Sequence, residues 1–511
     1  MPSGDWYPLH HAKYPLVEAR AWLASVLQTL NGTRALCVIG AGAGWVVDAA
    51  EELPGEVRVL VFEPDIACCV AMFERRDLRE LIRAGRLLVV AGPEFEGAGD
   101  AWRLFGRINA EPPLLVHPVV AVARRAATVM AAHLIRKSIA DASANERARR
   151  RFAAPYLLNT LSNVPSLATE SDAGALFNLY PGKPVVIAAA GPSLNRNLEE
   201  LRPHRDNVVL VAADTALRTI LAAGLAPDFA VAVDPGKPNA RHLMSLPEFE
   251  QTALVAEASV QPTSLARFVG RTFFFRVDEH HPWPWLHSSG IDVSRLQAWG
   301  SVIVTAFDLG VRLGGNPLVF IGADLAYTDG QPYCRGTVYE DDWAVRVAEG
   351  ESLDDIWRHA ISMRPTVVEH HGGQAVVTAA HLVQFRDGLL NAIRSVSARV
   401  INATGVGILR DPRIEFLSLD AVLRGATPIA RRPLPRRMPS TFTVGTLQRN
   451  TARLAQRLDP SPEAWGPVLA EHDPPDPTLP DQCESVRLAL AHWAQVNDGA
   501  TGALGDQLKS A

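Results

Sequence analysis

The alternation of apolar runs and short polar breaks predicts a parallel β-sheet in the middle of the chain. Residues 185–188 form an unbroken apolar run that stops at Gly191-Pro192-Ser193, and residues 194–201 then have helical spacing. Gly191 allows a close backbone approach, Pro192 fixes φ, and Ser193 is a favourable helix N-cap. Because a helix N-terminus at a strand end favours negative charge, this unit is a candidate phosphate site. The alternative is a turn that only starts a helix.

Three further apolar runs, each followed by an aspartate, repeat this pattern. They are residues 208–212 before Asp214, 229–233 before Asp234, and 317–321 before Asp324. In a doubly wound sheet, ligands bind at the edge formed by the carboxyl ends of the strands. One aspartate after a strand is usually a turn former or a cap, but three of them beside the Gly191 turn favour a ligand site.

Further polar residues extend this candidate nucleotide site. Thr215, Asn239 and Ser301 stand where strand-end loops lead into predicted helices. The Asn239 amide could contact a phosphate or a sugar hydroxyl. Residues 328–340, which include Tyr333, form a long glycine-bearing loop after the Asp324 strand, and such loops usually act as lids or binding loops.

Paired histidines, His370 and His371, are a candidate for acid–base chemistry. Their adjacent spacing is not that of two metal ligands on a helix, which are four residues apart. An exposed turn is one interpretation. The other is that His370 is the general base, since imidazole titrates near neutral pH. Asp234 and Asp324 are the rival candidates for the catalytic group.

The N-terminal region predicts a second parallel sheet. An apolar run at residues 35–39 leads into Gly40, Gly42 and Gly44, then a helix, and a second strand that ends at Glu63. This is the order of a Rossmann-type opening, in which an acidic residue after the second strand holds a ribose. These residues are therefore a possible second nucleotide site, although glycine turns also serve close helix–strand packing. The glycine spacing with Glu63 also resembles the first motifs of S-adenosylmethionine-dependent methyltransferases. We favour a non-catalytic or regulatory Rossmann-like domain over an active methyltransferase.

The full pattern predicts an α/β protein with three parts. Residues 119–151 have the composition of one long basic helix, and residues 431–437 that of a basic, proline-rich linker. Helices are expected at residues 442–458 and 484–496. The predicted division is an N-terminal Rossmann-like domain (1–150), a proline-bearing connector (151–182), a central doubly wound nucleotide(-sugar)-binding domain (183–410), and a C-terminal linker with helices (411–511).

Composition excludes several classes of protein. The chain has 511 residues, is 48% hydrophobic, and carries a net charge of only −5, so no basic field indicates nucleic-acid binding. None of the five cysteines forms a Cys-x-x-Cys pair, which argues against a zinc site or a disulfide framework. No apolar run reaches membrane-spanning length, and the first residues lack the pattern of a signal peptide. A cytoplasmic location is expected.

Five motifs in order carry a family resemblance. They are Ala-Ala-Gly-Pro-Ser-Leu at 189–194, Ala-Asp-Thr-Ala-Leu at 213–217, Ala-Gly-Leu-Ala-Pro-Asp at 223–228, Val-Asp-Pro at 233–235, and Gly-Ala-Asp-Leu-Ala-Tyr-Thr-Asp at 322–329. Together they resemble the motility-associated factor (Maf) proteins, whose central domain is shared with archaeal 6-hydroxymethylpterin diphosphokinases (MptE-like proteins). The sequence departs from many relatives in having Ala189 in place of glycine and Tyr333-Cys334 in place of a histidine-containing pair.

The resemblance implies a sialyltransferase-like central fold and a flagellin glycosyltransferase. Such an enzyme moves a nonulosonic acid, of pseudaminic, legionaminic or sialic type, from its CMP-activated form to Ser or Thr of flagellin or another surface acceptor. No metal is then required. The donor-binding residues that the resemblance implies are Gly191, Pro192, Ser193, Asp214, Ser301, Asp324, Tyr327 and Tyr333.

Two other functions stay open at this point. The first is pyrophosphate transfer from ATP to a hydroxymethylpterin, in which the strand-end aspartates would hold Mg²⁺. The second is a non-catalytic protein that binds a nucleotide sugar or flagellin. No Walker A motif occurs, which removes an ordinary P-loop kinase.

Overall fold

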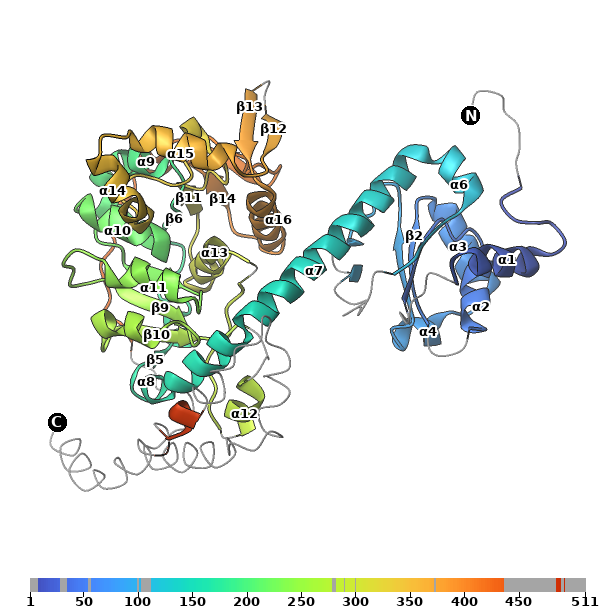
Figure 1. The fold of residues 1–511 in the computed structure, drawn as a ribbon, viewed down its shortest axis with the longest axis horizontal. Helices are drawn as coiled ribbons and strands as arrows, with labels where there is room; N and C mark the ends of the chain where they lie inside the picture. The colour runs from blue at the N-terminus through green and yellow to red at the C-terminus, as the bar shows by residue number, and fades with distance from the viewer. Residues whose placement is uncertain are drawn as a thin grey trace. The chain divides into compact units, whose positions relative to one another are not determined.

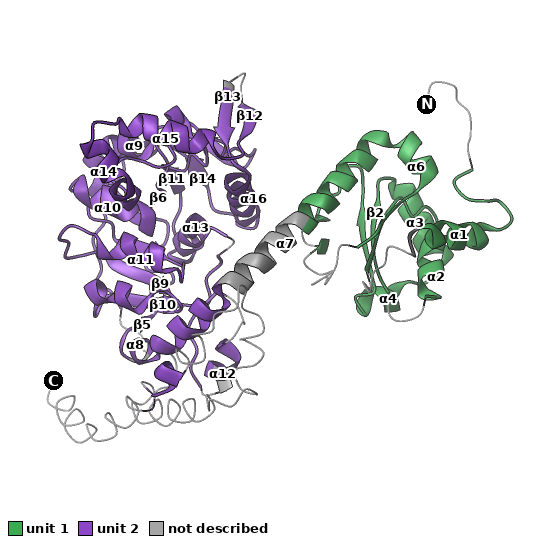
Figure 2. Cartoon of the chain, viewed as in Figure 1, with its two compact units in different colours: residues 1–149 green, residues 150–511 purple. Residues whose placement is uncertain are grey.

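The chain forms two compact units, residues 1–149 and 150–511 (Figure 2). The computed structural model describes residues 8–27, 35–53, 57–98, 101–102, 112–277, 282–288, 290–298, 300–371, 374–435, 484–488 and 491. Each unit contains a parallel β-sheet with flanking helices, which confirms the predicted α/β class. No helix in these described ranges is long and apolar enough to cross a membrane.

The first unit has a four-stranded sheet with the order β3-β2-β1-β4. Every pairing is parallel, and the sequence expectation of a Rossmann-like domain is confirmed. The strands are β1 (Ala35–Ile39), β2 (Arg58–Glu63), β3 (Leu87–Ala91) and β4 (Leu114–Val116). The helices are α1 (Pro15–Leu27), α2 (Trp45–Glu51), α3 (Ile66–Arg75), α4 (Arg79–Arg83) and α6 (Pro118–Ala123).

The second unit is built on a nine-stranded sheet with the order β15-β14-β11-β6-β7-β8-β9-β10-β5. Figure 1 labels several of its strands, among them β6, β9, β10 and β11. All eight pairings are parallel. The central strands are near-continuous apolar runs because helices cover both faces. The strands are β5 (Ser171–Asp172), β6 (Val185–Ala188), β7 (Val209–Ala213), β8 (Phe229–Ala232), β9 (Ala253–Glu257), β10 (Thr272–Phe275), β11 (Leu318–Ile321), β14 (Val400–Asn402) and β15 (Ile414–Phe416).

Helices cover the two faces of this sheet. One face packs against α13 (Val302–Arg312) and α16 (Ala380–Arg394). The other packs against α9 (Leu194–Leu201), α10 (Asp214–Ala222) and α17 (Leu419–Leu423) at one end, and against α7 (Arg125–Ser162), α8 (Val164–Thr169) and α11 (Lys237–Met244) at the other. The remaining elements are α12 (Trp283–Ser288), α14 (Ala344–Ala348), α15 (Leu353–Ser362), a hairpin of β12 (Val367–His371) and β13 (Gln374–Thr378), and the 3₁₀ turns η1 (Ala173–Leu176), η2 (Arg202–Asn207), η3 (Pro262–Phe268), η4 (Thr328–Gly330) and η5 (Val338–Trp343).

The segment predicted to be a connector belongs to the second unit. Helix α7 runs through Pro155 to Ser162, and β5 then pairs with β10. The Asn159 amide donates to the carbonyls of Pro235 and Ser259, and Asn163 donates to those of Ala258 and Val260. Residues 151–182 were predicted to be a connector because of their prolines, and the structure forms most of them into α7, α8, β5 and η1.

The second sheet extends beyond the predicted limits of 183–410 at both ends, since β5 precedes them and β15 follows them. The unit boundary at 149/150 agrees with the predicted 150 within one residue. The predicted helix at 442–458 lies outside the described residues. Of the predicted helix at 484–496, residues 484–488 are helical, and Val486 packs against the apolar cluster that includes α7 and α8.

Candidate functional site

The candidate site lies where the strand order of the large sheet reverses. From β6 the chain moves through β7, β8, β9 and β10 on one side, and it returns through β11, β14 and β15 on the other. Doubly wound sheets bind ligands at such a switch point, outside the carboxyl ends of the strands. The Gly191-Pro192-Ser193 turn follows β6, and Asp324 follows β11, so the fold brings together two motifs that are 131 residues apart.

Asp324 holds the turn that follows β6. The Ser193 hydroxyl donates to Oδ1 of Asp324 at 2.6 Å, and the Thr328 hydroxyl donates to Oδ2 at 2.7 Å. A Cβ atom on Gly191 would lie 2.2 Å from Oδ1 of Asp324, so only glycine fits there. Burial raises the pKa of Asp324, and the hydrogen bonds from Ser193 and Thr328 oppose that shift. Asp324 therefore positions the turn and has both carboxylate oxygens engaged.

The backbone amides of this turn are engaged within the protein, while its role in binding a phosphate stays a prediction. The N–H groups of Gly191 and Leu194 donate to Gly322 O and Gly191 O, and that of Ser193 faces Asp324. Pro192 has no N–H to offer. Ser193 occupies the N-cap position of α9, as predicted, but its hydroxyl binds Asp324 and makes no cap bond. The turn gives the edge its shape, while its own amides are already used.

Neighbouring loops fix this part of the edge. The Asn197 side chain accepts from the N–H of Gly322 at 3.0 Å, and the Thr404 hydroxyl accepts from the N–H of Ala323 at 3.1 Å. A Cβ atom on Gly407 would lie 2.0 Å from the carbonyl oxygen of Asp324. The Asp324 strand end is thus held from both neighbouring strands, β6 and β14, as a rigid support.

A second group of polar side chains lies along the same edge. We call it the edge cluster, and it consists of Asp214, Asp234, His242, Tyr327, Tyr333 and Tyr339. Each member is close enough to another member to shift its pKa or to contact its ring. The members come from the ends of β7, β8 and β11 and from the helix and loop that follow β8 and β11.

Asp214 is the most buried member of the edge cluster that carries a carboxyl group. Burial raises its pKa to about 7, with the nearby carboxylate of Asp234 adding to the shift, while the N–H and hydroxyl of Thr215 lower it. Both Thr215 groups donate to Oδ1 of Asp214. A carboxyl group with this pKa exchanges protons near neutral pH, which suits a general acid or base.

Two tyrosines from the loop after β11 stack beside these carboxyl groups. The rings of Tyr333 and Tyr339 are 4.5 Å apart at 22°. Burial raises the pKa of Tyr333, and Tyr327 and Asp214 contribute to the shift. Burial also raises the pKa of Tyr339, with Tyr333 and both carboxyl groups contributing. Both phenols are therefore neutral hydroxyl donors at physiological pH.

His242 completes the edge cluster from α11. Its ring lies edge-on to Tyr339 at 5.2 Å. Burial and the adjacent Arg241 lower its pKa to about 4, although Asp234 acts in the opposite direction. Within the described ranges, neither His242 Nδ1 nor the Tyr327 hydroxyl has a hydrogen-bond partner, and the two side chains are 3% and 7% exposed. Buried polar atoms without partners indicate a place where a ligand supplies them.

The loop at residues 328–340 is fixed at its centre to the sheet's helices. The Arg335 N–H donates to the side chain of Asn195 at 2.8 Å, and the Thr219 hydroxyl donates to the Arg335 carbonyl at 2.9 Å. The Arg335 guanidinium lies 4.5 Å above the ring of Trp357. The expectation of a lid therefore does not apply to this stretch, which holds Tyr333 against the site.

The remaining predicted residues are placed less centrally. Asn239 is half-buried in the first turns of α11, and Ser301 precedes α13 without capping it through its side chain. His370 is exposed and pairs with Ala375 in the β12–β13 hairpin, outside the large sheet. His370 is therefore not a member of the edge cluster.

Sequence reasoning missed His242 and Tyr339 as site residues. His242 lies on a helix with no motif spacing, and Tyr339 is one of several aromatic residues in a long loop. The only available signal was that both lie downstream of strand ends that carry aspartates. Their convergence depends on the order of strands in the sheet.

The glycine turn of the first unit is closed by the protein itself. Oε2 of Glu63 accepts from the N–H groups of Ala41 and Gly42, at 2.8 and 3.0 Å, and Nε2 of His10 accepts from Ala43 at 2.9 Å. A Cβ atom on Gly44 would lie 2.4 Å from Met72, and one on Gly40 would lie 2.7 Å from Val120. The glycines therefore lie in close-packed positions, and Glu63, whose side chain is fully buried, is engaged by the N–H groups of the turn.

Known proteins resemble this chain in sequence and in fold. The family model described as "6-hydroxymethylpterin diphosphokinase MptE-like" matches residues 158–330. A segment of 60 residues is 40% identical to a protein of Treponema pallidum (strain Nichols) described as uncharacterized, and it spans 12% of this chain and 29% of that relative.

A solved structure matches over a wider range. The structure of the MAf glycosyltransferase from Magnetospirillum magneticum AMB-1 aligns with 93% of this chain and 78% of its own, at 17% sequence identity and a TM-score of 0.51. The family match begins inside α7 and ends after Asp324, so it includes β5 to β11 and the turn at Gly191. This chain therefore carries an MptE-like domain at residues 158–330, within a fold that it shares with a Maf glycosyltransferase.

Proposed function

We propose that this protein is a glycosyltransferase that moves a nonulosonic acid from a CMP-activated donor to a Ser or Thr hydroxyl of flagellin or another surface protein. The observation that carries the proposal is the edge cluster at the switch point of an MptE-like domain. It combines neutral phenols, a carboxyl group whose pKa is near 7, and buried polar atoms without partners. The likeness in fold to a Maf glycosyltransferase supports it.

The donor is expected to place its phosphate against the tyrosines. A CMP-sugar carries one negative charge on its phosphodiester, and phenol hydroxyls donate to such a group without a metal. The Tyr327 hydroxyl is buried and has no hydrogen-bond partner within the described ranges. Tyr327 is also close enough to Tyr333 to raise the pKa of that phenol. The Gly191 turn then forms a wall of the donor pocket, and Asp324 keeps that wall in place.

Asp214 is the proposed general base. The acceptor oxygen forms a bond to the anomeric carbon of the sugar while the bond from that carbon to the CMP phosphate oxygen breaks. The acceptor proton moves to the Asp214 carboxylate, and the electron pair leaves on CMP. The raised pKa of Asp214, about 7, makes its carboxylate a stronger proton acceptor than an exposed aspartate. Asp234, a rival candidate, is half-buried and accepts from the N–H of Gly236 at 2.9 Å.

The MptE-like match favours pyrophosphate transfer from ATP to a hydroxymethylpterin as a second candidate. In that reaction Asp214 and Asp234, which interact electrostatically, would hold Mg²⁺ through their carboxylate oxygens. Bound Mg²⁺ would neutralise the developing charge on the phosphates. The two functions therefore predict opposite metal dependence for the same two aspartates.

A ligand and turnover panel separates these functions. The purified chain is tested with CMP, CTP and ATP–Mg²⁺ by thermal shift, where a ligand at 100 times its Kd stabilises its unit by about 2.7 kcal/mol. A shift with CMP, together with transfer from CMP-pseudaminic or CMP-legionaminic acid to flagellin in EDTA, supports the glycosyltransferase. A shift with ATP–Mg²⁺ alone and release of AMP with the pterin would replace it. CMP binding without transfer would leave a nucleotide-sugar-binding protein.

A further inference from the structure

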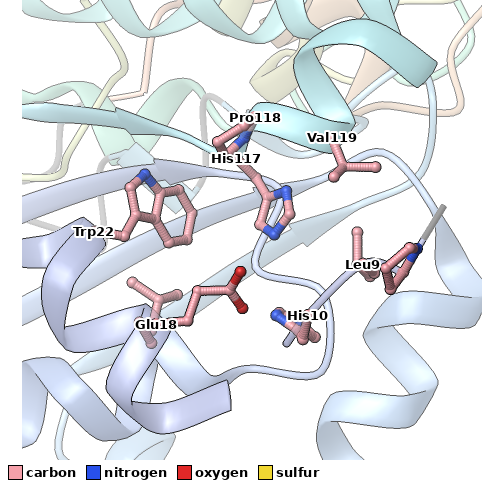
Figure 3. Close-up of a pocket in the computed structure, with 10 residues that line it drawn as sticks. Leu9, His10, Glu18, Trp22, His117, Pro118 and Val119 are labelled. Carbon is pink, nitrogen blue, oxygen red and sulfur yellow. The ribbon is translucent and has the colours of Figure 1, made fainter. Parts of the chain in front are cut away.

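The first unit contains a cavity of about 150 Å³ that is separate from its closed glycine turn (Figure 3). It lies beside the carboxyl end of β4, where the strand order of the small sheet reverses between β1 and β4. The residues that line it come from the segment before α1, from α1 itself, from α2 and from the start of α6. They are Pro8, Leu9, His10, Glu18, Ala19, Trp22, Val46, His117, Pro118 and Val119.

Aromatic rings form one wall of this cavity. His117 lies edge-on to Trp22 at 5.1 Å and edge-on to His10 at 5.5 Å. Figure 3 shows the Trp22 and His117 rings on one side and the Glu18 carboxylate directed between Trp22 and His10. The wall is therefore shaped for a compact body that packs on aromatic surfaces, with a polar group near Glu18.

The Nδ1 atom of His117 is buried beside this cavity without a hydrogen-bond partner among the described residues. The side chain is 5% exposed, and no described residue forms a hydrogen bond with its Nδ1. Burial and the neighbouring His10 lower the pKa of His117, although Glu18 raises it. The ring is thus neutral near pH 7, and Nδ1 is available to a ligand as a single donor or acceptor.

The charge at the cavity is negative. Burial and Arg75 lower the pKa of His10, so that both imidazoles are neutral. Glu18 is then the one charged side chain among the described residues that line the cavity. One of its carboxylate oxygens accepts from the N–H of His11 at 2.7 Å, and the other accepts no hydrogen bond from the residues that the structure describes. A carboxylate oxygen of this kind can accept from a ligand. A cation fits this site better than an anion.

Two other ligand classes fit poorly. A dinucleotide needs the N–H groups of the glycine turn, and those of Ala41, Gly42 and Ala43 already donate to Glu63 and His10. A metal ion needs several ligands together, and the described residues contain no group of three suitable side chains. A cavity of 150 Å³ can hold a molecule the size of benzene.

We propose that this cavity binds a small organic cation, an ammonium group on a compact apolar body, which Glu18 and His117 hold by its charged end and Trp22 by its apolar end. The ammonium donates to the Glu18 carboxylate and to Nδ1 of His117. The apolar body packs on Trp22, and an ammonium near that ring also gains cation–π attraction. The site is independent of the edge cluster, since it lies wholly within the first unit.

The test compares benzylamine with benzyl alcohol, which has the same shape but no charge. Isothermal titration of the full chain near neutral pH is expected to show benzylamine binding roughly tenfold more tightly, the combined effect of a partly exposed ion pair and a cation–π contact. Glu18→Gln is expected to reduce this preference to the part that the cation–π contact supplies, roughly threefold, and to leave benzyl alcohol binding unchanged. Glu18 is on the exposed side of α1, so its replacement does not disturb the core.

Glu74→Gln is the matched control. Glu74 is an exposed carboxylate of the same unit, on α3, and it does not line the cavity. Its replacement is expected to leave both affinities unchanged. Equal binding of the two probes, an unchanged preference in Glu18→Gln, or no binding of either probe would each overturn the proposal. A preference that Trp22→Leu and Glu18→Gln each weaken would establish it.

Discussion

The two parallel sheets have similar glycine turns, but the side chains around those turns differ. In each, a glycine turn follows an interior strand of the sheet, β1 or β6, and a carboxylate from another strand end binds that turn. Glu63 accepts from Ala41 and Gly42 in the first unit, and Asp324 accepts from Ser193 in the second. In the first unit, the His10 side chain accepts a hydrogen bond from the N–H of Ala43 and so covers the turn. In the second unit, the polar side chains of the edge cluster lie along the same sheet edge as the turn. A glycine turn therefore says little about ligands until the side chains around it are known.

The largest expected effect comes from Asp214→Asn in the second unit. If Asp214 is the base, transfer should fall about 10³-fold, within the range that general base catalysis contributes. The rate of the original protein should rise with pH through a pKa of about 7, and the variant should lose that rise. Transfer assays over a pH series, with CMP binding as a folding control, check this. Unchanged transfer would exclude Asp214 as the base.

The same substitution has a predicted sign for stability. The folded-state pKa of Asp214 is raised from 3.8 to about 7. The contribution of this group to the free energy of unfolding is therefore full below pH 3.8 and is lost as the pH rises to about 7. Asn stays neutral, so Asp214→Asn should raise the melting temperature above pH 7 while it lowers activity. A lower melting temperature at that pH would show that the carboxylate is better compensated than its burial implies.

Glycine replacements compare the two turns directly. Gly191→Ala brings a Cβ atom within 2.5 Å of the backbone carbonyl of Gly322, which cannot move freely, and should cost about 3 kcal/mol of unfolding free energy. Gly42→Ala meets the side chain of His10 at 2.3 Å, which can swing away, and should cost less, about 1 kcal/mol for the positive φ. Calorimetry that resolves the two units measures both. Equal losses would mean that the turns are equally rigid.

A change at His242 should alter acid sensitivity. Its folded-state pKa is lowered to about 4. The stability that neutral His242 contributes is therefore fully present above pH 6.5 and is lost as the pH falls from 6.5 toward 4. His242→Phe keeps the ring contact with Tyr339 and removes that titration, so its melting temperature should fall less between pH 6.5 and pH 4, by the equivalent of about 2 kcal/mol. Parallel pH dependence of the two proteins would contradict this.

The smallest effect is expected in the first unit. Glu63→Gln replaces one carboxylate oxygen by an NH₂ group that faces an N–H donor, and it should destabilise that unit by about 1 kcal/mol. Transfer activity should be unchanged, because the edge cluster lies in the other unit. Separate melting of the units and a transfer assay test both statements. Lost transfer would show that the first unit takes part in catalysis.

Much of the architecture was accessible from apolar patterning alone. The runs that end at Asp214, Asp234 and Asp324 are strands of one parallel sheet, and those before Gly40 and Glu63 are strands of another. These predictions succeeded because strands buried on both faces must be continuously apolar. The connector failed because Pro155 looked like a helix break, and tertiary packing overrode that local preference.

The candidate site was predicted in position but not in composition. Ser193 and Asp324 were each expected at the edge, and the structure places them there, hydrogen-bonded to each other. Their contact with a donor phosphate stays a prediction. His370 was a candidate by its chemistry, but it is exposed on a hairpin. No sequence motif identifies His242 or Tyr339 as a site residue. The contact between their rings is seen only in the structure. Local motifs identify strand ends, and they do not say which strand ends are neighbours.

The two α/β sheets, the glycine turns and the aspartates at the strand ends can be read from the amino-acid sequence, because hydrophobic period and backbone conformation are local properties. The position of β11 beside β6 appears only in the folded chain, and it brings Asp324 to the turn at Gly191 and Asp214 to the tyrosines. The contact by which His10 closes the first turn likewise appears only there. Hydrogen bonds and buried charge depend on distances between segments far apart in the chain, which no local pattern contains.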